Sequence, residues 1–556
     1  MNPFEEFLRQ TQTTRVVKTR KKLGRAIVQS AVITLIIFAV VDYITLPAYT
    51  FHSPSTMFLL AMFSGLFGFL VQAFSFKTTK VTLISYAISA LLVSYVLVGS
   101  LIGAEFLRAT AYRDQITIKE MKEFNEEFET IGLNRIPVVD KQTAVQLGDK
   151  QLGTVSGLGS QFFVDSQYSL INVNDGIFRV SPLDHRDFFK WLQNRNEGIQ
   201  NYVSVNVTNP TDVRLVAVSA GMKVSPNSFF NQDLARHVRF KYRTLIFGDY
   251  TFEIDDDQNP YWVVSVIKPE IGPFGGLSAQ GAVLVNPVTM DTQYYDIDEL
   301  PHWVDRVQPS SIAWSQIDNW GYYVHGFINT LFNQKDMLQT TDGYNYVVID
   351  NQVYVYSGLT SLGGDRSIVG FTLINLKSKE ATFYQIGGAD EYAAMASAEG
   401  QVQHLNYRST FPVLLNISNT PTYFVSLKDQ EGLVKKYSFI AVSNYDAVGV
   451  GDTVAEAQRN YILKLREIGM VKDDETRYTE ITGTVAMVST AIVDGNSVYY
   501  ITLDEDPRLF VVNVSVNLEV LFTTENDEVT MKFFDNKENI VEVDYFDHLA
   551  INFKAP

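Results

Sequence analysis

The residues that could hold a metal ion are spread thinly along this chain. It contains seven histidines, scattered singly, and no cysteine, so a zinc site would need ligands from three or four distant segments. The run 255–259 (DDDQN) offers the oxygen ligands that calcium prefers, but Pro260 stands where a calcium loop needs glycine. Asp255, Asp257 and Asn259 are therefore only weak metal candidates, and a polar turn before a strand explains them better. We expect no metal and no cofactor.

Sequence motifs for nucleophilic or phosphate chemistry are absent. The chain has neither the Gly-x-Ser-x-Gly elbow of hydrolases nor a Gly-Lys-Ser/Thr phosphate loop. A glycosidase needs only two carboxylates about 5–10 Å apart, and the 58 acidic residues after position 105 could hide such a pair. A cleft lined by two carboxylates would favour an enzyme, whereas a groove between repeated modules would favour binding. We predict no particular catalytic residue.

Three glycine-rich stretches lie between expected strands. Glycine at such places permits a positive φ or a close approach by another chain. The residues concerned are Gly157, Gly159, Gly275, Gly276, Gly363 and Gly364. Tight turns are the default interpretation, and interaction loops are the alternative.

A long apolar region precedes the part of the chain that carries these residues. The apolar runs 27–48, 57–76 and 81–104 each approach or exceed the ~20 residues that a helix needs to cross a bilayer, and no comparable run follows. The sequence therefore predicts a basic tail over 1–25, a three-helix membrane anchor over 26–105 and a large water-soluble part. The lipid bilayer is the first expected partner.

The distribution of basic residues predicts the orientation. Seven Lys or Arg precede the first run, Lys77 and Lys80 lie between the second and third, and the loop 49–56 has none. The positive-inside rule then places the N-terminus in the cytoplasm and everything after position 105 outside the cytoplasmic membrane.

Two features of the spans could carry a function of their own. Asp42 lies near the outer end of the first run, where reaching the interface is a better interpretation than proton relay or transport. Gly99 and Gly103 form a small-xxx-small pattern, which suits packing within the chain or a homo-oligomer through the transmembrane helices.

Composition excludes one class of partner and indicates a compartment. The formal net charge is −17, and the residues after position 105 include 36 basic and 58 acidic side chains, which argues against nucleic acid as a partner. The absence of cysteine in a large exported part favours a bacterial envelope protein over a eukaryotic ectodomain. A hydrophobic fraction of 46% supports packed cores.

The soluble part reads as repeated α+β modules. A juxtamembrane helix is expected within 106–133, with its amphipathic pattern over 114–132. Strand–turn–strand segments then recur about every 80–90 residues, at 202–216, 281–295 and 370–384. The modules predicted from this repeat cover 134–225, 226–310 and 311–470.

Each module should pack helices on a small antiparallel sheet. In the first module, the helix 185–195 is expected to bury Phe188, Phe189 and Trp191. A helix over 454–467 should precede the C-terminal part, 471–556, whose five or so short strands predict a small OB-like β-barrel. Its acidic loops favour a structural or protein-binding role over binding to nucleic acid.

Several short motifs between positions 136 and 466 point to a known group of proteins. They are GLGSQ (157–161), NRNEG (194–198), GMKVSP (221–226), FGG (274–276), TTDGYNY (340–346), AMASAEGQVQ (394–403) and FPVLLNI (411–417). With these motifs the chain resembles an uncharacterised family of mainly Gram-positive bacterial membrane proteins of no known activity. The hairpin 282–294 also resembles the PepSY or cystatin-like hairpin of secreted bacterial modules, which implies an interaction or inhibitory role.

The leading hypothesis is therefore a non-enzymatic binding or scaffolding protein of the bacterial cell envelope. Its expected partners are other envelope proteins or wall components. Two alternatives stay open: a cell-wall or peptide hydrolase with a carboxylate pair assembled between modules, and an accessory subunit of a membrane transport or secretion complex.

Overall fold

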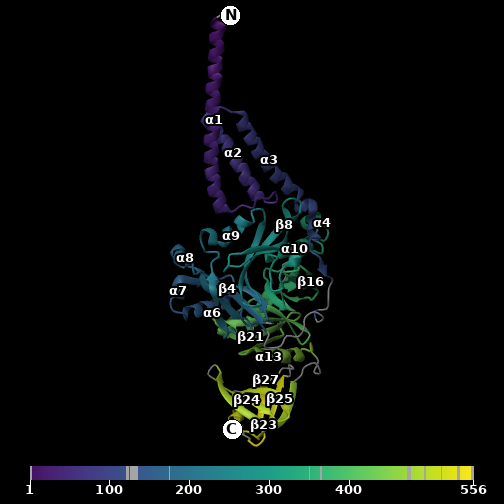
Figure 1. The fold of residues 1–556 in the computed structure, drawn as a ribbon. Coiled ribbons are helices and arrows are strands. Elements are labelled where there is room, and N and C mark those ends of the chain that lie inside the picture. Colours follow the sequence, from purple (N-terminus) through teal and green to yellow (C-terminus); the bar gives the residue numbers. More distant parts are fainter. Residues whose placement is uncertain are drawn as a thin grey trace.

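The chain divides into three apolar helices, a body of antiparallel sheets and a C-terminal ring of strands (Figure 1). The computed structural model describes residues 3–119, 124, 136–174, 176–349, 351–363, 366–471, 478–493, 496–514, 516–534 and 539–551. The helices lie at one end, the ring lies at the opposite end, and the sheets fill the space between them.

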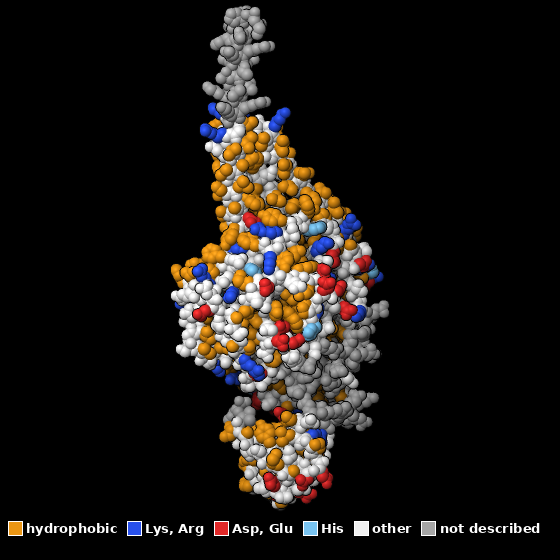
Figure 2. Space-filling model, viewed as in Figure 1, with side chains coloured by type: hydrophobic (Ala, Val, Ile, Leu, Met, Phe, Trp, Pro, Cys, Tyr) orange, Lys and Arg blue, Asp and Glu red, His pale blue; other side chains and the backbone are white. Residues whose placement is uncertain are grey.

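The three apolar helices are confirmed. Helix α1 runs over Pro3–Thr45, α2 over Pro54–Ser75 and α3 over Lys80–Ile102. Within them, Lys22–Thr45, Pro54–Ser75 and Lys80–Ile102 are long and apolar enough to cross a membrane. Figure 2 shows the apolar side chains that cover this end of the molecule. Ser53 and Thr79 cap α2 and α3 by accepting hydrogen bonds from backbone N–H groups in the first turn.

Four larger sheets make up the body, and each contains an antiparallel meander of four strands. The first sheet has β2 (Phe162–Val164), β3 (Ser169–Val173), β4 (Gly176–His185), β5 (Ile199–Asn206) and β6 (Val213–Met222). The second has β7 (Ile246–Ile254), β8 (Pro260–Ile271), β9 (Gly275–Val285) and β10 (Thr292–Asp296).

The third and fourth sheets follow the same plan. The third has β1 (Ile118–Lys119), β11 (Leu338–Thr340), β12 (Asn345–Ile349), β13 (Gln352–Ser361), β15 (Gly370–Asn375) and β16 (Ala381–Tyr384). The fourth has β18 (Arg408–Ser409), β19 (Val413–Ile417), β20 (Thr420–Lys428), β21 (Val434–Ala441) and β22 (Val448–Gly451). A short extra pair joins β14 (Ser367–Ile368) to β17 (Gly388–Ala389).

Short helices precede or interrupt these sheets. They are α4 (Glu105–Arg113), α6 (Lys141–Gly153), α7 (Leu158–Gln161), α8 (Phe188–Asn194), α9 (Leu234–Lys241), α10 (Ser310–Tyr322), α11 (Phe327–Phe332), α12 (Glu391–Gln401) and α13 (Val454–Glu467), with single 3-10 turns at Phe230–Gln232, Ile297–Glu299, Gln403–Leu405 and Leu518–Phe522. The helix expected over 454–467 has those bounds in the structure.

The C-terminal strands form a closed ring. They are β23 (Tyr478–Val493), β24 (Asn496–Leu503), β25 (Asp506–Asn513), β26 (Glu528–Phe534) and β27 (Ile540–His548). Their order is β23-β24-β25-β27-β26, with β26 paired back to β23 and a parallel contact between β25 and β27. A core cluster of their own, with Phe510, Phe533 and Phe546 fully buried, fills this ring.

All three strand–turn–strand segments of the sequence are antiparallel hairpins: β5–β6, β9–β10 and β15–β16. Each hairpin ends a four-strand meander. The segment 311–470, expected as one module, is divided between the third and fourth sheets. The reason is that α12 and the meander β19–β22 repeat the same plan once more, without the spacing that marks the first three hairpins.

Two local predictions are wrong. The juxtamembrane helix lies earlier than expected, at Glu105–Arg113, and Ile118–Lys119 is a strand that pairs with β16, so the helix predicted from position 114 does not begin there. Most of its remainder lies outside the described residues. In α8, Trp191 is buried but Phe189 is 70% exposed. Positions two apart in a helix lie about 200° apart around its axis, so the two side chains point to opposite faces of α8.

The body of sheets is fastened to the ends of the apolar helices that lie next to it. Asp42 forms an ion pair with Arg243 at 3.0 Å and accepts a hydrogen bond from the Tyr49 hydroxyl at 2.7 Å. At the other side, the turn between β8 and β9 packs on the end of α3, where a Cβ on Gly99 would meet Phe274 at 2.7 Å. The Gly99-x-x-x-Gly103 pattern is therefore occupied by the chain's own β8–β9 turn.

Candidate functional site

The candidate site is a cleft at the junction of the four sheets. Its main cavity has a volume of about 600 Å³ and adjoins a narrow, largely apolar inner pocket. The walls come from the first sheet and α6, from β7 of the second sheet, from the strand β12 of the third, and from Phe411 beside the fourth. The cleft therefore lies between modules and not within one of them.

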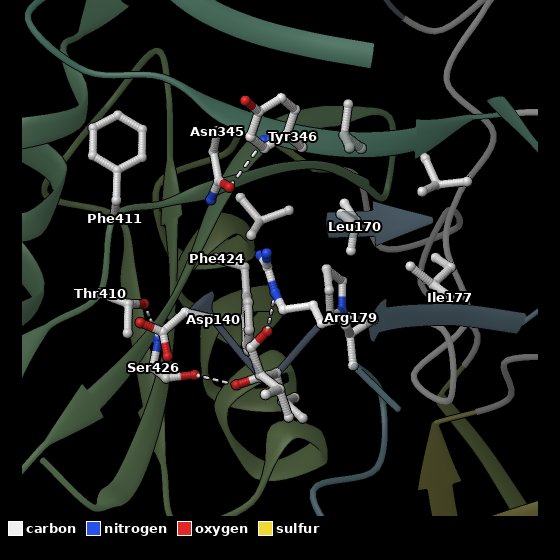
Figure 3. Close-up of a pocket in the computed structure, with 17 residues that line it drawn as sticks. Asp140, Leu170, Ile177, Arg179, Asn345, Tyr346, Thr410, Phe411, Phe424 and Ser426 are labelled. Atoms are coloured by element: carbon white, nitrogen blue, oxygen red, sulfur yellow. Dashed lines mark hydrogen bonds between the residues drawn. The ribbon is translucent and has the colours of Figure 1, made fainter. Parts of the chain in front are cut away.

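Arg179 reaches this cleft from the centre of the first sheet. It lies on β4, where its backbone pairs with Leu170 of β3 and Val205 of β5. The side chain is buried, and its Nε donates a hydrogen bond to the Val139 carbonyl at 3.2 Å. Figure 3 shows its guanidinium extending between Asn345 on one side and Asp140 on the other.

Burial lowers the pKa of Arg179 to about 10, an effect that the negative charge of Asp140 opposes and the positive charge of Arg306 adds to. The guanidinium still carries its charge at neutral pH. Removing a charge from water costs free energy unless a partner offsets it. Arg179 has no ion-pair partner among the described residues, so its charge is available to a ligand.

Arg306 is the second cation of the cleft. Its Nη2 donates to the Tyr346 hydroxyl at 2.9 Å, and its guanidinium lies 4.6 Å from the centre of the same ring. The Nε is buried and has no hydrogen-bond partner within the part of the chain that the structure describes. Tyr344 stands beside Tyr346, with ring centroids 5.8 Å apart in an edge-to-face arrangement. Two guanidiniums and an aromatic pair thus line one cavity.

Asp140 does not neutralise these guanidiniums, because other groups already bind it. Lys428 donates to both of its carboxylate oxygens, at 2.7 and 2.9 Å, and Asp140 also caps the N-terminus of α6. Burial tends to raise the pKa of Asp140, but the hydrogen bonds from Lys428 and Thr143 outweigh burial and lower it. The Asp140 carboxylate is therefore ionised and already hydrogen-bonded to Lys428 and to α6.

The cleft is locally cationic in an acidic protein. Lys141, Arg179 and Arg306 line the main cavity against Asp140 and Asp249, and Lys428 offsets the charge of Asp140. A planar guanidinium binds a carboxylate or a phosphate through two parallel hydrogen bonds. The arrangement can therefore hold an anionic group at its floor and an apolar or aromatic portion against Tyr344, Tyr346 and Phe411.

The structure also brings two carboxylates together between modules. Glu253 on β7 accepts a hydrogen bond from the Asp305 backbone N–H at 2.9 Å, and Asp305 accepts one from the Asn172 N–H at 2.9 Å. Burial raises the pKa of Glu253 to about 7 and also raises the pKa of Asp305, which the charge of Glu253 raises further.

This pair is poorly placed for hydrolysis. Asp305 lines a second cavity of about 600 Å³, together with His302 and Lys377, but Glu253 is fully buried and does not line it. General acid–base work requires both groups to reach the substrate. The hydrogen bonds of the pair instead join the first sheet, the second sheet and the segment before α10.

The weak metal candidates form a turn between β7 and β8. Both carboxylate oxygens of Asp255 accept hydrogen bonds: Oδ1 from the N–H groups of Asp257 and Asn259, and Oδ2 from the Asn259 amide. These bonds explain the run 255–259 as a side-chain-stabilised turn. Among the described residues, no group of three or more His, Asp or Glu side chains is arranged to hold a metal ion.

The glycine loops are not part of the cleft. Gly157 has φ +86° and begins α7, and the Gly159 carbonyl accepts a hydrogen bond from Arg186 at 2.6 Å. Gly275 and Gly276 permit a close approach, but by other parts of the same chain: a Cβ on Gly275 would meet the hydroxyl of Tyr112 on α4 at 2.1 Å, and a Cβ on Gly276 would meet the Ile271 side chain at 2.6 Å. Gly363 lies in an open turn after β13, and Gly364 lies outside the described residues.

Sequence reasoning did not single out Arg179, Arg306 or the tyrosine pair as a site. One signal was present: the motif 340–346 contains Tyr344, Asn345 and Tyr346, and the motif 411–417 begins at Phe411. The motifs 194–198 and 221–226 have a structural explanation instead, since Gly198 and Gly221 both adopt a positive φ. No family model matches this chain, and no curated protein matches it.

Proposed function

We propose that this chain is a membrane-anchored binding protein of the bacterial cell envelope, whose central cleft takes an anionic group of another envelope protein or of a wall component. The observation that carries the proposal is the pair Arg179 and Arg306, which line a cavity of about 600 Å³ and form no ion pair with a carboxylate in the described chain. The site lies between modules, as expected for binding.

The modules are of the PepSY or cystatin-like type in this proposal, and the C-terminal ring is OB-like. A helix followed by a four-strand antiparallel meander, repeated through the body, supports the first assignment. The ring order β23-β24-β25-β27-β26, with parallel third and fifth strands, supports the second. Both assignments favour an interaction role. The resemblance to uncharacterised Gram-positive membrane proteins fits such a protein.

A hydrolase is the second candidate, because Glu253 and Asp305 form a carboxylate pair between modules. Binding is favoured because Glu253 is sealed from solvent, whereas the Arg179–Arg306 cleft is open. Substitution separates the two. Glu253→Gln should leave binding to the cleft intact, while it would abolish hydrolysis that used this pair.

Photo-crosslinking in cells tests the binding proposal. A photoreactive phenylalanine at position 344, where Tyr344 is 46% exposed in the cleft, should capture a discrete partner with the full-length protein in its membrane. Position 445, where Tyr445 is 51% exposed outside the cleft, is the matched control and should not capture it. Arg306→Gln should abolish the cross-link, since a hydrogen bond to a charged group contributes about 1.5–3 kcal/mol, or roughly 10- to 100-fold in Kd.

The chemistry of the ligand is tested on purified full-length protein in nanodiscs. An acidic peptide or glycerol phosphate should raise the melting temperature at constant ionic strength, and the corresponding amidated peptide or glycerol should not. Comparing the two anions distinguishes a carboxylate from a phosphate ligand. The proposal fails if neither anion stabilises the protein, or if Arg306→Gln leaves both the stabilisation and the cross-link unchanged.

A further inference from the structure

Two short helices leave an apolar surface exposed next to the end of α3. Helix α4 begins at Glu105, three residues after α3 ends at Ile102, and α11 packs against it, with the rings of Phe106 and Phe327 6.2 Å apart. The exposed side chains are Phe106, Leu107, Ile328, Leu331 and Phe332, each more than half exposed. We call these five residues the apolar foot.

The foot continues a surface that lipid must cover. On the last turns of α3, Leu97, Val98 and Leu101 are each more than half exposed, as expected for a helix that faces hydrocarbon. Only Gly103 and Ala104 separate that helix from α4, so Phe106 and Leu107 lie close to the edge of the bilayer. In Figure 1, α4 lies directly at the end of α3, on the side of the body that faces the spans.

Charged groups at the foot match a lipid surface. Arg108 is exposed, and its Nε donates to the Ile102 carbonyl at 3.3 Å, which holds its guanidinium at the level where α3 ends. Lipid phosphates lie at that level of the bilayer, and long basic side chains favour it. Glu105 is engaged within the protein, since it accepts a hydrogen bond from the Tyr323 hydroxyl at 2.7 Å.

We infer that the apolar foot inserts into the bilayer leaflet next to the end of α3. Short amphipathic helices bind in this way, with an apolar face about 5–10 Å deep at the boundary of headgroups and acyl chains. Together with the Asp42–Arg243 ion pair on the other side, the foot would hold the body against the membrane at two separate places. The inference is independent of the proposed cleft function and of which leaflet is concerned.

The absence of cysteine makes the test direct, because a single introduced cysteine can carry a spin label without any background. Ile328→Cys and Phe189→Cys are matched, since the two side chains are 71% and 70% exposed and only Ile328 belongs to the foot. The labelled full-length proteins are reconstituted in nanodiscs, one copy per disc, and the accessibility of each label to oxygen and to a water-soluble nickel chelate is measured.

The expected result for Ile328→Cys is several-fold lower accessibility to the nickel chelate than for Phe189→Cys, together with higher accessibility to oxygen, which concentrates in lipid. Leu331→Cys should agree with it. Equal accessibility of Ile328 and Phe189 to the nickel chelate would overturn the inference. So would protection from both reagents, because that result indicates coverage by protein. Both labelled proteins should keep the melting temperature of the parent, since the substituted side chains are exposed.

Discussion

At the scale of single residues, several charged side chains of the body are buried or half-buried, and only some of them have an ion-pair or hydrogen-bond partner of opposite charge among the described residues. Lys428 and Asp140 form a partly buried ion pair, and Glu253 and Asp305 share a buried network, whereas Arg179 and Arg306 are left without carboxylate partners in the described chain. Arg179 is buried and Arg306 is half-buried, and leaving a cation unpaired away from water lowers stability. This loss of stability is the reason why we propose that the two arginines bind a ligand.

Glu253 gives a prediction of pH dependence. Its pKa is raised from an ordinary 4.5 to about 7 by burial, so between these values the folded state binds more protons than the unfolded state. This contribution to stability is fully present below pH 4.5 and is lost as the pH rises through 7. Glu253→Gln should therefore remove a pH-dependent loss in the free energy of unfolding of up to about 3 kcal/mol. The melting temperature of the full-length variant should accordingly decrease less than that of the parent between about pH 5 and 7.5.

The substitution keeps the hydrogen bonds. The amide oxygen can accept from the Asp305 N–H, and the amide nitrogen can donate to the Thr251 hydroxyl, which now donates to Glu253 and lies 3.4 Å from the Val263 carbonyl. Arg306, Lys377 and Asp305 act electrostatically on the same carboxyl, so only the difference between the two proteins is interpreted. Parallel pH profiles for the two proteins would show that Glu253 does not titrate in this range.

At the scale of elements, the β8–β9 hairpin is one of the joints between the body and the apolar helices. Its turn fits against Gly99 and Gly103 at the end of α3, and Tyr112 of α4 donates to the Gly103 carbonyl at 2.8 Å. Gly103 has φ −88°, which any residue can adopt. Its lack of a side chain is therefore needed for space and not for backbone conformation.

Gly103→Ala should weaken this joint. The new Cβ would lie 2.9 Å from the Ile271 carbonyl oxygen, so the backbone of the turn must move, at a cost of about 1–3 kcal/mol. Gly65→Ala on α2 is the control, because its Cβ would meet only the Ser89 hydroxyl at 3.4 Å. We expect limited proteolysis to cleave the β8–β9 turn faster in Gly103→Ala than in Gly65→Ala. Equal rates would mean that the joint tolerates the methyl group.

Elements with a strong periodic signal could be predicted, and those set by tertiary contacts could not. The three apolar helices and α13 follow directly from their sequence patterns. The strand at Ile118–Lys119 lies in a helical pattern, but it pairs with β16 more than 260 residues away in the chain. No local pattern encodes such a pairing, since β structure depends on its neighbours. The cleft escaped prediction for the same reason, because Arg179 on β4 and Arg306 in the segment before α10 line one cavity only through tertiary packing.

At the scale of the whole molecule, the body contacts the ends of the apolar helices at several places, while the C-terminal ring has a core of its own. The residues that fill the ring come only from positions 481–546, whereas one core cluster of the body combines residues from the first, second and fourth sheets. The body therefore behaves as one unit, and its orientation follows that of the spans.

Orientation is predicted from charge alone and is tested with single cysteines in whole cells. Tyr445→Cys, on the exposed surface of the body, should react with a membrane-impermeant maleimide. Thr78→Cys, in the exposed loop between α2 and α3, should react only after the cells are opened. The reverse labelling pattern would place the body in the cytoplasm. It would then contradict the proposal that the cleft binds an envelope protein or a wall component.

The second sheet touches both the spans and the cleft. The turn of its β8–β9 hairpin lies on α3, and β7, which pairs with β8, carries Asp249, Tyr250 and Thr251 into the cavity wall. A change in the tilt of α3 would therefore have one hydrogen-bonded sheet to cross before it reached the wall of the cleft.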